Sequence, residues 1–129
     1  MDLALVLLAI PICLADCSSF VIPNVYNRIL FCFACLHLVI HGFGDFDKIA
    51  RSVLILLFLL MFGLGMGDIK LLALILITHS FSVIDYLGYV LLWAMVHIVV
   101  LAGVSRRIPS KIPLAPSIFI GLSTYLATR

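Results

Sequence analysis

The stretch FGLGMGDIKLL, residues 62–72, stands between two long apolar runs and decides how the chain divides into helices. It places an acid, Asp68, and a base, Lys70, directly after glycines at positions 63, 65 and 67. Glycine has no Cβ, so it permits a turn and lets another backbone approach closely. We therefore expect the chain to break between two helices here; a kink at 67–70 within one bent helix is the alternative.

The composition is that of an integral membrane protein. Of the 129 residues, 65% are hydrophobic and only 11% are charged, whereas soluble domains carry about 25% charged residues. Apolar segments follow one another from Leu3 to Thr128 with short polar breaks, which leaves no room for a soluble domain. We expect an all-α, polytopic fold with a single transmembrane domain over 1–129, in contact with the lipid bilayer. No basic block suggests nucleic acid, so we expect no nucleic-acid partner.

The polar breaks predict about six membrane spans, within a range of four to six. A bilayer core of about 30 Å needs roughly 20 helical residues. The apolar start of the chain resembles a secretory signal, but Asp2 and the lack of early Lys or Arg favour a retained first helix. The predicted spans are 3–18, 25–43, 50–66, 69–84, 86–104 and 113–128.

The distribution of Lys and Arg predicts the orientation of these spans. With the N-terminus outside, five basic residues fall in the inner loops and three outside, which favours this orientation. The stretch SRRIPSKIP at 105–113 is the strongest cytoplasmic marker. The inner set is Arg28, Lys70, Arg106, Arg107 and Lys111, and the outer set is Lys48, Arg51 and Arg129.

The number of crossings decides which acids can meet. Asp16 ends the first predicted span and Asp68 follows the third, so two crossings separate them and both face the cytoplasm. The near copy HGFGDFDK at 41–48 carries Asp45, which is one crossing from Asp16 and belongs on the opposite face. The alternative for Asp16 and Asp68 is a pair of interfacial helix caps.

Two acids brought together have a characteristic chemistry. Both cannot ionise easily, so one keeps a proton while the other activates water. This is the machinery of aspartic proteolysis, which needs no metal and no cofactor. Gly65 and Gly67 would let an extended peptide approach Asp68, although Gly63 and Gly67 also form a small-xxx-small pair that is typical of helix packing in membranes.

Three stretches in order make the chain similar to a known family. They are ADCSSFVIPN at 15–24, GMGDIK at 65–70 and IPLAPSIFIGL at 112–122. The chain resembles the type IV prepilin peptidases, bacterial membrane aspartic proteases of the GxGD type, and most of all the small members that accompany tight-adherence pili. In that family an acid precedes an Ile/Leu-Pro-Asn element, a second lies in GxGDxK, and Pro-xx-Pro opens the last helix.

The resemblance implies a role for each matching residue. Asp16 and Asp68 become the catalytic pair, Gly65 and Gly67 the motif glycines, and Lys70 the basic member. Structural roles are implied for the remaining matches, which are Pro23, Asn24, Pro113 and Pro116.

The family cleaves the N-terminal leader from prepilins at the cytoplasmic face of the bacterial inner membrane, so prepilins are the implied partner. The chain departs from the family pattern at CSSFV, residues 17–21, where relatives carry basic residues that bear on how the leader is held. It also lacks the CxxC loop of larger relatives, so we expect peptidase activity without a separate methyltransferase or zinc-binding domain.

The same residues also have alternative interpretations. Asp16 and Asp68 could serve as a proton relay in a small carrier, or the chain could be a catalytically inactive pilus-assembly subunit. A presenilin-like protease would need a Tyr-Asp pair, which Asp16 does not provide. The cysteines of CFAC and the pair His37 and His41 beside Asp45 are better explained by packing and by a helix end than by a metal site.

Overall fold

The computed structural model describes residues 2–42, 45–79, 82–105 and 112–128. Within these ranges the chain forms six α-helices and no strand, which confirms the all-α class. Each predicted span overlaps mainly with one helix, although several ends differ. The helices are α1 Asp2–Ser19, α2 Asn24–His41, α3 Phe46–Met61, α4 Met66–Thr78, α5 Val83–Ser105 and α6 Ala115–Ala127.

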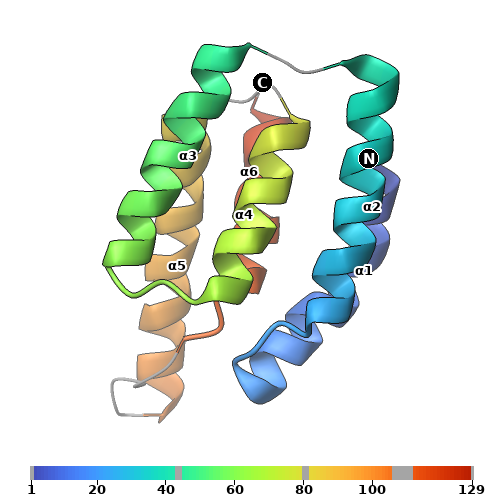
Figure 1. Cartoon of the computed structure of the whole chain (residues 1–129). Helices are drawn as coiled ribbons and strands as arrows, with labels where there is room; N and C mark the ends of the chain where they lie inside the picture. The colour runs from blue at the N-terminus through green and yellow to red at the C-terminus, as the bar shows by residue number, and fades with distance from the viewer. Residues whose placement is uncertain (1, 43–44, 80–81, 106–111, 129) are drawn as a thin grey trace.

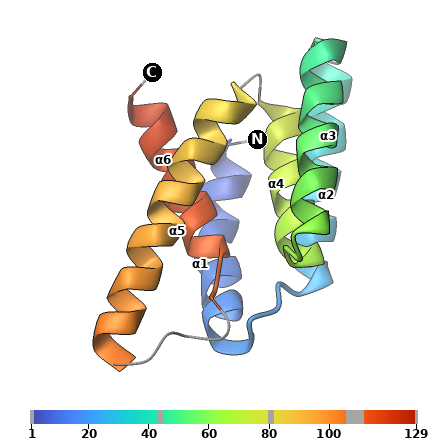
Figure 2. The ribbon, with the colours of Figure 1, turned by 90° about the vertical axis from the view of Figure 1, so that its left-hand side faces the viewer.

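The helices run alternately up and down in one bundle (Figures 1 and 2). The α1–α2 and α3–α4 connections and the start of α6 lie toward the lower end of Figure 1, whereas α3 begins at the upper end. The end of α1 and the start of α4 are therefore at the same end of the bundle. The basic stretch SRRIPSKIP falls mostly on 106–111, outside the described residues.

The GxGxGD stretch is a true break between helices, and the alternative of one bent helix is wrong. Gly63 has a φ of 82°, a left-handed conformation that favours glycine. Its backbone N–H donates to the Leu60 carbonyl (3.0 Å) and the Leu64 N–H donates to the Leu59 carbonyl (3.3 Å). This is the Schellman pattern of a helix C-terminus, and it turns the chain from α3 directly into α4.

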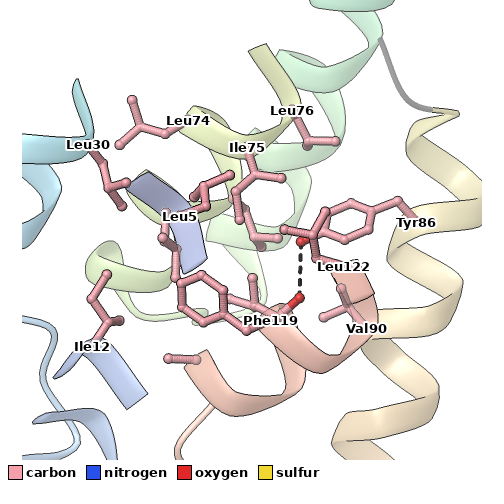
Figure 3. Packing of buried hydrophobic residues seen from close by; sticks show 14 of the residues in the cluster. Leu5, Ile12, Leu30, Leu74, Ile75, Leu76, Tyr86, Val90, Phe119 and Leu122 are labelled. Atoms are coloured by element: carbon pink, nitrogen blue, oxygen red, sulfur yellow. Dashed lines mark hydrogen bonds between the residues drawn. The ribbon is translucent and has the colours of Figure 1, made fainter. Parts of the chain in front are cut away.

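The core is centred on α4 and α6. Leu71, Ile75 and Ile118 have no exposed surface. In Figure 3 the Tyr86 ring of α5 points toward α6, where its hydroxyl donates to the Ile118 carbonyl (3.4 Å). At Gly121 an added Cβ would lie 3.1 Å from backbone atoms of Val90, so α5 and α6 are in close contact. The buried helices α4 and α6 are therefore the fixed part of the bundle from which the site is built.

Among the described residues, two helices are long and apolar enough to cross a membrane, judged by length and composition: α2 and the part of α5 from Val83 to Val104. The apolar helices Leu5–Ser19 and Ala115–Ala127 are shorter. Several predicted boundaries were displaced. Helix α4 is Met66–Thr78 and not 69–84, and α3 is Phe46–Met61 and not 50–66. The charged residues Asp47 and Lys48 form the first turn of α3, where an acid is favoured by the helix dipole.

Candidate active site

Two helix ends bring the predicted acids to one pocket. Asp16 lies in the last turn of α1 and Asp68 in the first turn of α4. Both line a pocket of about 340 Å³, together with four further residues of the predicted site. The complete lining is Asp16, Phe20, Val21, Ile22, Asn24, Gly65, Met66, Gly67, Asp68 and Lys70.

Asp16 is held from the side of α6. Its side chain is buried, and its Oδ2 accepts a hydrogen bond of 2.8 Å from the backbone N–H of Ala115. Ala115 is the first residue of α6, where backbone N–H groups have no partner within the helix and the helix dipole favours a negative charge. The hydrogen bond therefore fixes the position of the carboxylate.

Pro113 and Pro116 lie on either side of this contact. Pro116 is in the first turn of α6, where proline has no intrahelical hydrogen bond to lose. Pro113 is buried just before the helix. The two prolines thus flank the backbone N–H that Asp16 uses, although neither lines the pocket.

Asp68 lies in a different environment. It is partly buried in the first turn of α4, and its Oδ1 has no hydrogen-bond partner among the described residues. Burial and the nearby Asp16 carboxylate both disfavour a charge on Asp68. Asp68 therefore keeps a proton to higher pH than an ordinary aspartate does.

Two glycines allow the chain to pack closely around Asp68. A Cβ at Gly65 would lie 3.0 Å from Asp68 Oδ2, and one at Gly67 would lie 3.2 Å from the Cβ of Ile22. The start of α4 thus lies against the α1–α2 connection. Gly63 has no neighbour within 4 Å of such a Cβ and lies outside the helices, so the helix-packing interpretation of Gly63 and Gly67 is wrong.

The Asn24 and Lys70 side chains connect two of the sequence motifs. Lys70 Nζ donates to Asn24 Oδ1 at 3.4 Å, so α4 and α2 are joined at the pocket wall. Pro23 precedes α2 in an extended conformation, with φ −58° and ψ 134°, which fits the restricted φ of proline. It lies next to the pocket but does not line it.

The near copy of the motif is not part of this site. Asp45 precedes α3, at the end of the bundle opposite to the start of α4 (Figure 1). It is exposed and forms an ion pair with Lys48 (2.7 Å), which lowers the pKa of Asp45. Asp45 and Asp68 therefore lie at opposite ends of the bundle, as the number of crossings predicts.

The histidines and cysteines form no comparable cluster. The His37 and His41 rings lie 4.5 Å apart at the end of α2. Across the ranges that the structure describes, no group of three or more His, Cys, Asp or Glu side chains could hold a metal ion.

Sequence reasoning missed the contact between Asp16 and Ala115. The two residues are 99 positions apart, and an alanine in an apolar run gives no sign of binding a carboxylate. Proline at 113 and 116 was the available signal, because proline is frequent in the first turn of a helix.

Comparisons of the chain with protein-family models, curated proteins and solved structures gave no match.

Proposed function

We propose that this chain is an aspartic endopeptidase of the membrane, in which Asp16 and Asp68 hydrolyse a peptide bond. One observation carries the proposal. Two carboxylates from separate helices line a single pocket, one anchored on a helix N-terminus and the other with a buried oxygen that has no partner among the described residues. An unpaired buried carboxylate oxygen is costly, so its presence suits a group that awaits a water or a substrate.

The two environments assign different roles to the acids. Asp16, held by the α6 N-terminus, is the ionised base, and it takes a proton from the attacking water. Asp68, which retains a proton, polarises the peptide carbonyl and then donates that proton to the leaving amine. The carbon–nitrogen bond breaks and one water is consumed. A proton passed from Asp16 to Asp68 restores the starting state.

The three motif stretches support a prepilin leader as the substrate. Residues of the first two, 15–24 and 65–70, line the pocket, and the third, 112–122, supplies the N–H that holds Asp16. Gly65 leaves room for the Asp68 carboxylate and Gly67 for Ile22 of the α1–α2 connection, so both glycines allow the acid to lie at the pocket.

The exposed apolar surface supports a location in a lipid bilayer. Large apolar side chains are widely exposed on α1, α2, α3 and α5, including Val39, Phe46, Met61 and Val104, each at least 82% exposed. Such a surface exceeds what a soluble monomer presents. We propose a multi-pass protein of the bacterial inner membrane with both acids toward the cytoplasm.

The lengths of α4 and α6 fit a site below the membrane surface. Each has 13 residues, fewer than the roughly 20 that a full crossing needs. Both helices are largely enclosed by the others, and a helix can end at membrane depth where protein surrounds it.

The decisive experiment is a cleavage assay in membranes. The chain is co-expressed with a pilin of the same genome, and the mass of the pilin shows whether its leader is lost. We expect cleavage by the unaltered protein and by the control variant Asp45→Asn, but none by Asp16→Asn or Asp68→Asn.

Two results would contradict the proposal. Loss of cleavage in Asp45→Asn alone would place the site at the wrong end of the bundle. If the unaltered protein cleaves nothing, or Asp68→Asn cleaves normally, a carrier or an inactive assembly subunit becomes the better explanation.

A further inference from the structure

A second and larger hollow lies between α2 and α4, beside the candidate active site. It has a volume of about 660 Å³ and shares Asn24 and Lys70 with the pocket of the two acids. Its walls come from α2 between Asn24 and Cys32 and from α4 between Lys70 and Ile77. We call it the α2–α4 groove. Because the two hollows share wall residues, an extended molecule can run from one into the other.

The α2–α4 groove contains a buried polar side chain without a partner. Asn27 lines it and is 6% exposed. Neither its Nδ2 donor nor its Oδ1 acceptor has a hydrogen-bond partner among the described residues. Leaving such a group unpaired is destabilising, and most buried polar groups in proteins are paired. Both amide atoms are buried, so the Asn27 side chain must turn toward the groove to meet a ligand, and there it suits one that supplies both an acceptor and a donor.

A peptide backbone meets this requirement. Each residue of an extended chain points its N–H and its C=O to the same side, and this pair is the complement of a primary amide. A phosphodiester or an acyl ester offers only acceptors and would leave Asn27 Oδ1 unpaired. Within a helix the backbone groups already bond to one another, so the segment beside Asn27 must be extended.

The remaining walls indicate the side chains of the bound segment. Phe31, Ala73, Leu74 and Ile77 make most of the groove apolar. The eight residue steps from Asn24 to Cys32 correspond to about 12 Å along a helix, a length that accommodates about three or four residues of extended chain.

We infer that the α2–α4 groove binds, in extended form, the apolar stretch of the substrate polypeptide next to the scissile bond, and that Asn27 pairs with its backbone. This inference rests on the proposed peptidase function. It requires a helical substrate to unwind over about one turn before it reaches Asp16 and Asp68.

Two native cysteines allow a direct test. Cys32 lines the groove, whereas Cys35, one turn further along α2, is also exposed but does not line it. The Asp68→Asn protein, with Cys13 and Cys17 replaced by serine, is mixed with synthetic prepilin peptides that carry one cysteine at successive apolar positions. After mild oxidation we expect a disulfide with Cys32 at one or two peptide positions. The Cys32→Ser variant should lose the product and Cys35→Ser should retain it.

The same peptides separate the two proposals. If wild-type protein cleaves them but Cys32 is not trapped, or Cys35 is trapped equally, the groove inference is overturned and the peptidase stands. If wild-type protein cleaves none of them, the peptidase proposal fails and the groove inference falls with it. Protection of Cys32 from maleimide by phosphatidylglycerol, but not by peptide, would overturn the inference in favour of an anionic lipid at Arg28 and Lys70.

An Asn27→Leu variant tests the amide itself. We expect KM to rise roughly tenfold, because two hydrogen bonds to the substrate are lost, while kcat changes little. The melting temperature should stay the same or rise, since an unpaired buried amide is removed. Cys35→Leu, on the same helix outside the groove, is the control and should leave KM unchanged. A lowered melting temperature with an unchanged KM would show that Asn27 is merely structural.

Discussion

At the scale of single residues, the proton on Asp68 is the feature that most directly governs the proposed reaction. Burial and the Asp16 charge favour a protonated Asp68, and Asp68 acts in that form. As pH rises the protonated fraction falls, so kcat/KM should decline by roughly tenfold per pH unit on the alkaline side. The measurement is peptide cleavage by detergent-solubilised protein from pH 5 to 9. A rate that stays flat across this range would contradict the shared proton.

The Asp16 contact with Ala115 gives a second residue-scale prediction. Ala115→Pro removes the N–H that donates to Asp16 Oδ2 at a helix start, where proline has no intrahelical hydrogen bond to lose, and it also moves Leu114 out of its αR conformation. A hydrogen bond to a charged group contributes about 1.5–3 kcal/mol, so kcat should fall by roughly 10- to 100-fold. Ala115→Gly keeps the donor and serves as the control. Equal kcat values in two variants of equal helix content, measured by circular dichroism, would show that α6 does not position Asp16.

At the scale of helices, the close contact of α4 with the α1–α2 connection should depend on Gly67. A Cβ there would lie 3.2 Å from the Cβ of Ile22, and forcing such a contact costs about 1–3 kcal/mol. Gly67→Ala should therefore lower the melting temperature and reduce cleavage. Gly88 of α5 has no neighbour within 4 Å of an added Cβ, so Gly88→Ala should stabilise the helix by about 0.5–1 kcal/mol. Similar changes of melting temperature in Gly67→Ala and Gly88→Ala would contradict the close contact of α4 with the α1–α2 connection.

The helices were largely predictable from the sequence, because each polar break interrupts an apolar run long enough to form one helix. The helix boundaries were less predictable. Asp47 and Lys48 are charged and indicate a loop in the sequence, yet they form the first turn of α3. The two acids were predictable from the number of crossings between them. The contact of the Ala115 N–H with Asp16 was not predictable, since only the packing of α6 against α1 brings the two together. The place of Asn27 in the α2–α4 groove was not predictable either, because it depends on how α4 packs against α2.

At the scale of the whole molecule, the proposed orientation follows from the two ends of the bundle. The end with the start of α4 carries Asp16, Asp68 and Lys70, and the opposite end carries Asp45 and its partner Lys48. Because basic residues are more frequent in the predicted inner loops, we expect the α3–α4 connection in the cytoplasm and the α2–α3 connection outside. A substrate leader made in the cytoplasm then reaches the acids without crossing the bilayer.

Reporter fusions test this orientation without any assumption about catalysis. Alkaline phosphatase folds into its active form only outside the cytoplasm, so a fusion after residue 45 should be active and a fusion after residue 64 inactive. Green fluorescent protein at the same two positions should give the opposite pattern. If both phosphatase fusions are inactive, α3 does not cross the membrane and the six-span proposal is wrong. If the pattern is reversed, Asp16 and Asp68 face outward, and a peptidase with this pocket would have to act on substrates that have already crossed the membrane.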